Sequence, residues 1–275
     1  MISYFQAIIL GTTQGLTELF PISSLGHSII LPKILNWNID QNNNYFLSFL
    51  VATHLATALV LFLFFYKDWK KIFIGLYNSF KKRDLEVKDG KLGWLIIVGT
   101  IPAGIVGLLF QEKLKILFSS PKIVSIFLIL NGLVLYFGEY LRKKTIKKKN
   151  FNSLSWLQAI KIGTAQILAL LPGFSRSGST LVSGLLVGLS HEEAAKFSFL
   201  LATPIIAAAA LLKIPELISS NNIEAIKIVA VGAVAAGFSA YFSIKFLMKY
   251  FETKTLKPFA IYCVLAGLFL FIILF

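Results

Sequence analysis

Hydrophobic residues fill most of the chain in long stretches, and polar positions fall between them or at two interruptions. A membrane-spanning helix needs about 20 predominantly apolar residues. Six stretches approach that length: 46–66, 92–111, 122–141, 193–212, 226–248 and 257–275. The pattern therefore predicts an all-α integral membrane protein.

Two further apolar segments, 5–35 and 156–189, are interrupted in the middle. The first is broken by Pro-Ile-Ser-Ser-Leu-Gly at 21–26, and the second by Pro-Gly-Phe-Ser-Arg-Ser-Gly at 172–178. Irregular backbone at membrane depth is tolerated only where protein buries it or a polar cavity solvates it. Each segment is predicted to be a helix, a break and a second helix, with the break facing a cavity.

The two halves of the chain repeat one another at a constant offset. Gln6, Gly11, Gln14, Ser23 and Gly26 recur as Gln158, Gly163, Gln166, Ser175 and Gly178. A gapless match of this kind indicates an internal duplication. If each broken segment is a re-entrant hairpin, each half has three true spans, and that odd number inverts the second copy. We expect one membrane domain, 1–275, made of two inverted-topology repeats at 1–150 and 151–275, each a re-entrant helix hairpin plus three transmembrane helices.

Composition and charge support a protein embedded in a bilayer. The hydrophobic fraction is 56%, the charged fraction is 15% and the mean hydropathy is +0.76, which excludes one soluble domain of 275 residues. The net charge of +14 does not indicate a nucleic acid partner, because the basic residues lie in short runs between apolar stretches. By the positive-inside rule, the predicted loops 67–91 and 142–155 are cytoplasmic and both termini are external. The single cysteine, Cys263, excludes an intrachain disulfide.

Gln14 and Glu18 are four residues apart, so they share one face of the helix that ends before the first break. A carboxylate within the membrane is costly unless it is paired or hydrated, and such residues are functional by default. The alternative for both residues is a polar pair that packs two helices together.

The first break contains Ser23 and Ser24, one of which caps the next helix. His27 lies three residues beyond Ser24 on the same face. Ser24 is therefore predicted to be an activated nucleophile or a phosphate ligand, with His27 as the base or the acid. His54, inside a span, either lines the cavity or bonds a neighbouring helix.

The second break is the strongest local signal. Small residues let backbone amides approach a ligand, the following helix presents its positive end, and an arginine fork matches phosphate oxygens. The predicted phosphate-binding residues are Gly173, Ser175, Arg176, Ser177, Gly178, Ser179 and Thr180. By contrast, Ser190 and Glu193 fit a capping box, and His191 between them is expected at the surface.

Taken together, the Gln14 and Glu18 pair and the strings 21–27 and 172–178 resemble the bacterial undecaprenyl-pyrophosphate phosphatase family associated with bacitracin resistance. The resemblance implies hydrolysis of undecaprenyl diphosphate, a polyprenyl lipid, with Mg²⁺ or Ca²⁺ as the divalent cation. Glu18, Ser24, His27 and Arg176 match the family's proposed active-site positions. Many members have a glutamate in place of Gln14, so Glu18 is the metal ligand expected here and Gln14 a substrate-binding residue along with Ser23.

These residues favour phosphoryl transfer in which Arg176 and a cation clamp the diphosphate, Ser24 attacks and His27 moves the proton. Water as the nucleophile stays open as an alternative. So does a lipid-phosphate or anion transporter, because inverted repeats with broken helices are a transporter architecture. The pairing of Ser24 with His27, which transport does not require, favours the enzyme. The expected location is the bacterial inner membrane, with the site open to the outer side, and a homodimer is possible.

Overall fold

A computed structural model describes residues 2–41, 43–118, 120–142, 150–219 and 222–274, and these form helices without a named strand. The predicted all-α class is confirmed. The α-helices are α1 (Tyr4–Leu19), α2 (Ser24–Ile34), α3 (Asn44–Phe64), α4 (Tyr66–Lys82), α5 (Gly90–Phe118), α6 (Pro121–Arg142), α7 (Trp156–Ala165), α8 (Arg176–Leu186), α9 (His191–Ser219), α10 (Ile223–Phe251) and α11 (Lys257–Ile273). Two short 3₁₀ helices are η1 (Phe151–Ser153) and η2 (Gln166–Leu170).

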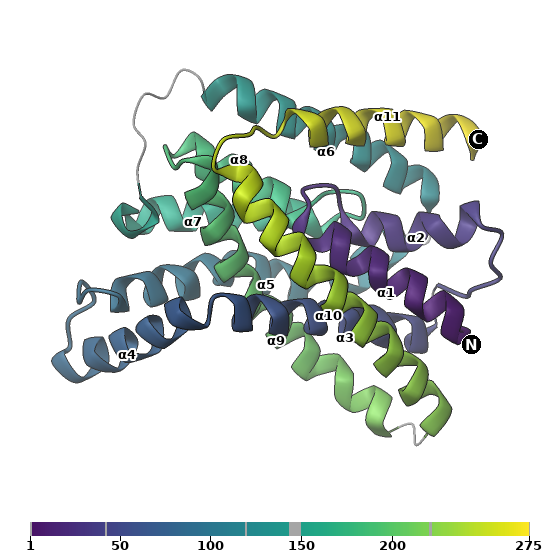
Figure 1. Ribbon diagram of the computed structural model, residues 1–275, viewed down its shortest axis with the longest axis horizontal. Coiled ribbons are helices and arrows are strands. Elements are labelled where there is room, and N and C mark those ends of the chain that lie inside the picture. The colour runs from purple at the N-terminus through teal and green to yellow at the C-terminus, as the bar shows by residue number, and fades with distance from the viewer. Residues whose placement is uncertain (1, 42, 119, 143–149, 220–221, 275) are drawn as a thin grey trace.

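Both interrupted segments fold as helix, break and helix. In the first, α1 leads to α2, and in the second, α7 and η2 lead to α8. Matching capping boxes start them, since Ser3 pairs with Gln6 and Ser155 pairs with Gln158. Figure 1 shows the open ends of the first hairpin on the side of both termini, while α7 begins at the opposite end, beside α4. This arrangement is consistent with inverted repeats.

Five described helices are long and apolar enough to cross a membrane: α3, the part of α5 from Gly90 to Phe110, α6, the part of α9 from His191 to Leu212, and α10. The sixth predicted span corresponds to α11, which is apolar but has 17 residues, the lower end of the spanning range. Large apolar side chains on the outer helices are exposed, for example Leu109 at 73%, Phe238 at 70% and Ile272 at 74%. A soluble protein rarely exposes so much apolar surface, so these side chains face lipid.

One predicted loop is a helix instead. Residues 67–91 were expected to form a charged loop, but α4 occupies Tyr66–Lys82. The prediction was wrong because the many lysines obscured a buried helical stripe of Trp69, Ile72, Gly75 and Ser79. The predicted loop 142–155 is described only in part, since residues 143–149 lie outside the described ranges.

Glycines let each hairpin pack backbone to backbone against the other repeat. A Cβ added to Gly11 of α1 would lie 2.1 Å from the carbonyl oxygen of Gly232 in α10. At the equivalent position of the second hairpin, a Cβ added to Gly163 of α7 would lie 2.0 Å from the carbonyl oxygen of Gly99 in α5. Close contact through small residues is how membrane helices gain packing energy. The first helix of each repeat is thus fixed against a long span.

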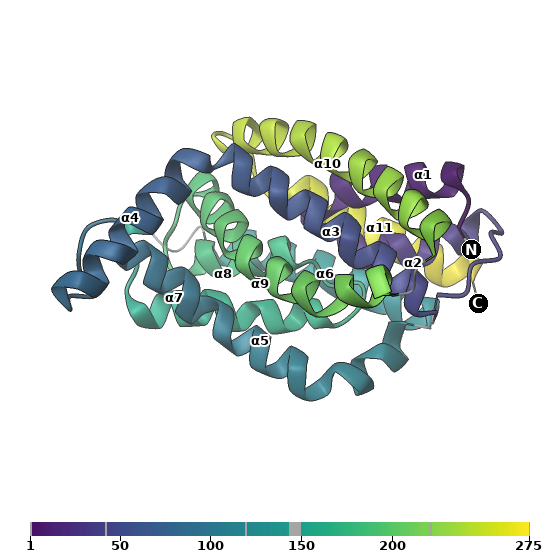
Figure 2. The ribbon, with the colours of Figure 1, turned by 90° about the horizontal axis from the view of Figure 1, so that it is seen from below.

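Fully buried side chains lie on most of the helices, and a run of them lies on α9. Phe197, Phe199, Leu200 and Leu201 of α9 are fully buried. Figure 2 shows α10, α3 and α9 side by side, with α5 on the far side of α9. The first half of α9 is therefore part of the core.

Gly11→Ala is expected to destabilise the protein by about 1–3 kcal/mol, because the new methyl group overlaps backbone that cannot move out of its way. The matched control is Gly104→Ala in α5, where a Cβ meets nothing within 4 Å. Thermal unfolding in detergent should show a lower Tm for Gly11→Ala and an unchanged or slightly higher Tm for Gly104→Ala. Equal Tm values for the two variants would contradict the packing described.

Candidate active site

Glu18, in the last turn of α1, is the centre of a polar cluster. Its Oε1 accepts a hydrogen bond from Arg176 Nη2 at 3.0 Å. Its Oε2 accepts from Ser24 Oγ at 2.5 Å and Gln14 Nε2 at 3.1 Å, and it lies 3.2 Å from His54 Nε2. These residues come from α1, α2, α3 and α8. One carboxylate therefore joins both hairpins and the first span.

The burial of this cluster makes each contact necessary. Glu18 is 7% exposed and Gln14 is fully buried. Removing one partner of a buried ion pair leaves an uncompensated charge and typically costs about 3–5 kcal/mol. The Glu18–Arg176 pair is thus both a connection between the repeats and a constraint on how the site is built.

Arg176 is the first residue of α8, and its guanidinium has a donor to spare. Nη1 donates to the carbonyl oxygen of Ser198 at 3.3 Å, while the buried Nε has no hydrogen-bond partner among the described residues. Thr180 Oγ1 donates to the carbonyl of Arg176 at 2.8 Å and lies 2.6 Å from Ser198 Oγ. The first amides of a helix have no intrahelical partner. The amides of Gly178 and Ser179 are bonded to Ser175, so the remaining donors for a phosphate are Nε and the amides of Arg176 and Ser177.

The other hydroxyls of the second break hold the loop in shape. Ser175 caps α8, since its Oγ accepts from the amide of Gly178 at 3.1 Å. Ser179 Oγ donates to the carbonyl of Ser175 at 2.9 Å, and Ser177 Oγ donates to the carbonyl of Phe20 at 3.2 Å. All of these predicted phosphate-binding residues are gathered here, but their hydroxyls are occupied within the protein.

Gly173 serves the loop through its conformation and its size. Its φ of 112° is one that residues with a side chain rarely adopt. A Cβ on Gly173 would also lie 2.5 Å from the carbonyl oxygen of Val124 in α6. Only glycine therefore lets the second break pack against α6.

The first break places Ser24 and His27 differently from the prediction. Ser23, at φ 70°, caps α2 by accepting from the amide of Gly26, and its carbonyl oxygen is 2.7 Å from His27 Nδ1. His27 Nε2 lies 2.7 Å from the Tyr262 hydroxyl. The expected pair of Ser24 with His27 is replaced by Ser24 with Glu18 and His27 with Tyr262. The two side chains lie about one turn apart along α2, so Ser24 meets α1 at Glu18 while His27 meets α11 at Tyr262.

Three residues at the site were not assigned from sequence. His54, left open above, contacts Glu18, and its Nδ1 lies 2.7 Å from the carbonyl oxygen of Leu50. Asn131 in α6 is fully buried and joins both breaks: Nδ2 donates to the carbonyl of Pro21 at 3.0 Å, and Oδ1 accepts from the amide of Ser175 at 3.0 Å. A lone amide in an apolar span was the available signal for Asn131, whereas no sequence pattern indicated Tyr262.

A divalent cation would find few ligands from the chain alone. The described residues contain no group of three or more His, Cys, Asp or Glu side chains that could hold a metal ion. Glu18 supplies one carboxylate, and the buried Oε1 of Gln14 has no hydrogen-bond partner among the described residues. Mg²⁺ is commonly bound by one or two carboxylates with substrate phosphates. These residues therefore fit a cation that takes most of its ligands from a bound diphosphate.

A second polar cluster lies apart from the site, and it corrects one expectation. His191 is 7% exposed rather than on the surface, because its Nε2 lies 2.7 Å from Glu139 Oε2 and Arg142 Nη1 donates to its Nδ1 at 2.8 Å. Ser190 does cap the amide of Glu193, but the Glu193 carboxylate accepts from the amide of Phe151. This cluster fixes the start of α9 against α6.

The chain is similar to known proteins along nearly its whole length. Residues 7–269 match the family model described as bacitracin resistance protein BacA. The chain is 43% identical over 291 residues to the undecaprenyl-diphosphatase of Mycolicibacterium paratuberculosis, covering 97% of this chain and 95% of that protein. It is 47% identical over 269 residues to undecaprenyl-diphosphatase 2 of Chromobacterium violaceum, covering 95% of each, and 44% identical over 272 residues to undecaprenyl-diphosphatase 2 of Oenococcus oeni, covering 97% of each.

Proposed function

The chain belongs to the bacitracin resistance protein BacA family, and from that premise we propose how its polar cluster dephosphorylates a lipid. The protein is a membrane phosphatase that converts undecaprenyl diphosphate to undecaprenyl phosphate and inorganic phosphate, which recycles the lipid carrier of cell-wall synthesis. The observation that supports this most directly is that Ser24, Glu18 and Arg176 form one buried, connected group. The transporter alternative is not favoured, because these relatives are named diphosphatases.

Arg176 binds the terminal phosphate and neutralises its charge. Its unpartnered Nε and the amides of Arg176 and Ser177 at the start of α8 are donors that belong to one loop. A guanidinium offers donors in a planar fork that matches phosphate oxygens, and a helix start favours an anion. Gly173 and Ser175 keep this loop in place, as their contacts with α6 and Gly178 indicate.

Ser24 is the nucleophile in this proposal, and Glu18 receives its proton. The Ser24 Oγ–H already donates to Glu18 Oε2 at 2.5 Å. As the Oγ–P bond forms, the bond from phosphorus to the bridging oxygen breaks, and undecaprenyl phosphate leaves with the electron pair. Glu18 holds the proton until the second step.

His27 is the proton carrier for that second step. Water attacks the phosphoserine, the P–Oγ bond breaks, and Ser24 recovers its proton from Glu18. His27 lies one turn along α2 from Ser24, with Nδ1 beside a carbonyl oxygen and Nε2 beside the Tyr262 hydroxyl. In that arrangement Nδ1 holds a proton and Nε2 is the acceptor. His27 can take the proton of the attacking water once Nε2 leaves Tyr262.

His54 positions Glu18 rather than touching the substrate. Its Nδ1 is anchored on the Leu50 carbonyl and its Nε2 meets Glu18 Oε2. This contact holds the carboxylate where it can serve Ser24 and Arg176 together. A group that orients a functional residue in this way typically contributes about 10–100-fold to activity.

The divalent cation, Mg²⁺ or Ca²⁺, would be held by Glu18 and the Gln14 Oε1 along with the diphosphate. When bound, it would neutralise charge on the phosphate oxygens. The residue at position 14 keeps an unpartnered oxygen that could serve this purpose. Loss of activity in a chelator, with recovery on adding Mg²⁺ or Ca²⁺, is expected, and full activity in the chelator would remove the cation from the proposal.

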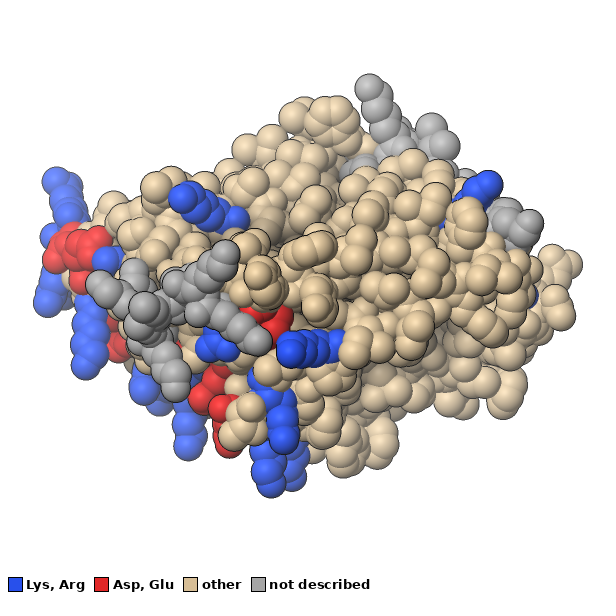
Figure 3. Space-filling view, turned by 90° about the horizontal axis from the view of Figure 1, so that it is seen from above, with Lys and Arg blue, Asp and Glu red and all other residues tan. Residues whose placement is uncertain are grey.

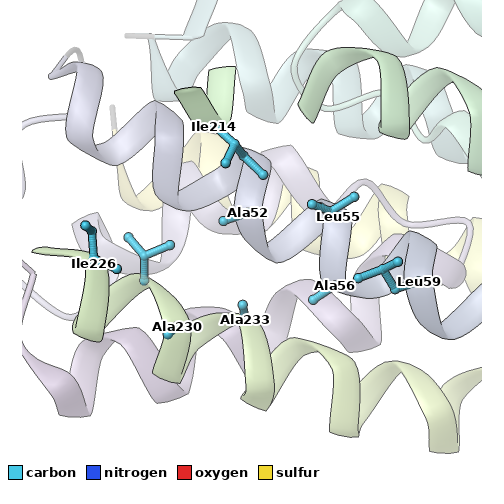
Figure 4. Close-up of a pocket in the computed structure, with 9 residues that line it drawn as sticks. Ala52, Leu55, Ala56, Leu59, Ile214, Ile226, Ala230 and Ala233 are labelled. Atoms are coloured by element: carbon cyan, nitrogen blue, oxygen red, sulfur yellow. The ribbon is translucent and has the colours of Figure 1, made fainter. Parts of the chain in front are cut away.

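The part of the polyprenyl tail nearest the diphosphate would lie in an apolar cavity between α3, α9 and α10. The cavity has a volume of about 270 Å³ and is lined by Ala52, Leu55, Ala56, Leu59, Ile214, Ile226, Val229, Ala230 and Ala233. Figure 4 shows these small and aliphatic side chains facing one another. The cavity begins on the turn of α3 that also carries His54. A prenyl chain there would leave its diphosphate near Glu18.

The orientation in the inner membrane is also proposed. The end of the molecule that carries α4 would be cytoplasmic and the end that carries both termini external. The site would then open to the outer side. The lysines on α4 support this orientation, because basic residues are enriched on the cytoplasmic side of a membrane protein. A cysteine at Lys88 that is labelled by an impermeant reagent from outside intact cells would reverse this orientation.

Ser24 and Glu18 act as one unit, so Ser24→Ala, Glu18→Gln and the double variant should each lose about a thousandfold or more of phosphate release, without multiplying their losses. His27→Ala should lose about a hundredfold. The assay is phosphate release from undecaprenyl diphosphate by purified protein. Ser28→Ala is the control, since the buried Ser28 hydroxyl on the same helix has no hydrogen-bond partner among the described residues. No release by the unsubstituted protein would refute the phosphatase, and near-normal turnover of Ser24→Ala would favour water as the nucleophile.

Arg176→Lys keeps the charge but loses the fork, so kcat/KM should fall about 100–1000-fold. The control is Arg83→Lys, at the exposed end of α4, which should leave kcat/KM unchanged.

His54→Gln keeps a donor near Glu18, and it should lower kcat by about tenfold with little change in KM. An unchanged kcat in His54→Gln, or normal turnover in Arg176→Lys, would contradict the assigned role.

Ala233→Phe should fill the apolar cavity and raise the KM for both undecaprenyl diphosphate and farnesyl diphosphate, because both would place their first isoprene units there, while leaving the KM for inorganic diphosphate nearly unchanged. Val234→Phe is the control, because Val234 is the neighbouring residue, is 73% exposed and does not line the cavity. An unchanged KM for undecaprenyl diphosphate in Ala233→Phe would show that the tail lies elsewhere.

A further inference from the structure

Helix α4 presents three distinct faces. The first, with Trp69, Ile72, Gly75 and Ser79, is buried against the protein. The other two are an aromatic stripe and a basic flank, both exposed to the surroundings. A helix with an apolar stripe beside a basic face is typical of proteins that lie at a membrane surface.

The buried face fixes how the other two are oriented. A Cβ on Gly75 would lie 2.3 Å from the amide nitrogen of Gly90 in α5, so the two helices touch through backbone. Trp94 Nε1 donates to Ser79 Oγ at 2.9 Å, and Ser79 Oγ donates to the carbonyl of Asp84 at 2.5 Å. The exposed stripe is therefore held in one direction.

The aromatic stripe consists of Tyr66, Phe73, Tyr77 and Phe80, which are 55%, 53%, 67% and 80% exposed. Their spacings of seven, four and three residues bring them to one side of the helix. Phe73 also contacts Phe62 and Trp69 at the edge of the buried face. Four rings in one exposed row require an apolar or interfacial environment.

The basic flank consists of Lys67, Lys70, Lys71, Lys81, Lys82 and Arg83, all of them exposed. The one acid within α4, Asp68, is already bound by Lys196 of α9 at 2.8 Å. In the following turn, Lys91 and then Trp156 hold the pKa of Glu86 below its usual value. Figure 3 shows lysines and arginines gathered at this end of the molecule, with acids among them, while most of the remaining face is uncharged.

The end of the span α3 determines the depth in the bilayer at which α4 begins. The span α3 ends at Phe64 and α4 starts at Tyr66, so α4 starts at the depth at which the span leaves the hydrocarbon. At that depth aromatic rings are placed among headgroups and lysines meet lipid phosphates. A nucleic acid would account for the basic flank but not for the aromatic stripe.

We propose that α4 is a lipid-binding helix that places its aromatic stripe at the headgroup boundary and its basic flank on anionic headgroups. The attractions of several lysines to such a surface add together. The helix would then fix the tilt of the α4–α5 hairpin relative to the bilayer. This inference does not depend on the phosphatase activity.

The test uses the full chain in nanodiscs, with a fluorophore attached at Tyr77→Cys on the stripe or at Lys71→Cys on the basic flank. The native Cys263 is fully buried, and the unsubstituted protein measures any labelling of it. Brominated phosphatidylglycerol should quench the Tyr77 probe at least twofold more than brominated phosphatidylcholine does. The Lys71 probe should be quenched much less by either lipid.

A Tyr77→Cys protein with Lys67, Lys70, Lys81 and Lys82 changed to Gln should lose the preference for the anionic lipid, while its quenching by phosphatidylcholine stays the same. Equal quenching by the two lipids in the lysine-intact protein would overturn the headgroup site. A Tyr77 probe that neither lipid quenches would overturn the proposal altogether, whether water or a second copy of the chain covers the stripe. Normal phosphate release by the Gln variant would confirm that folding is intact.

Discussion

The structure depends on one ion pair between two breaks in the membrane. Glu18 ends the first helix of one hairpin, Arg176 begins the second helix of the other, and they meet at 3.0 Å in a buried setting. Neither charge could stay at that depth alone, because an unpaired charge in hydrocarbon is costly. The two repeats must therefore approach at their breaks. The irregular backbone that results is satisfied there by side chains, with Asn131 bonding Pro21 and Ser175, and Ser177 bonding Phe20.

His54 and Gln14 both contact the same oxygen of Glu18. Both ring nitrogens face acceptors, the Leu50 carbonyl oxygen and the Glu18 carboxylate. His54 contacts Oε2 of Glu18, and Arg176 bonds Oε1 of the same carboxylate. Gln14 contributes an amide donor to Glu18 in place of a second negative charge. The charges of Glu18 and Arg176 therefore balance, and a diphosphate meets no excess negative charge from the side chains.

Much of this could be predicted from sequence because the signals were local. The apolar stretches indicated the spans, and the breaks at 21–26 and 172–178 indicated the hairpins and the residues within them. His54 could not be decided from sequence, since its role depends on the contact of α3 with α1. Tyr262 was missed because it meets His27 only through the packing of α11 beside α2. The error at α4 had another cause, since its lysines masked a helix that is buried along only one narrow stripe.

The internal repeat accounts for the presence of both a serine and an arginine in one site. Ser23 and Ser175 cap the second helix of their hairpins in the same way, accepting from the amides of Gly26 and Gly178. The next residue is then equivalent in the two repeats, and it is Ser24 in one and Arg176 in the other. Each stands at a helix start, where the backbone favours negative charge.

Because the repeats face one another, these two equivalent positions meet at Glu18 instead of forming two separate sites. The deeper glutamines kept their symmetry, since Gln14 and Gln166 are both buried and each has an unpartnered Oε1 among the described residues. The carboxylate exists in one repeat only, because Leu170 stands where Glu18 has its counterpart. The second repeat therefore supplies the guanidinium of Arg176 to the site but no carboxylate at this position. The serine and the acid thus come from one repeat and the arginine from the other, and the site forms only where the two repeats meet.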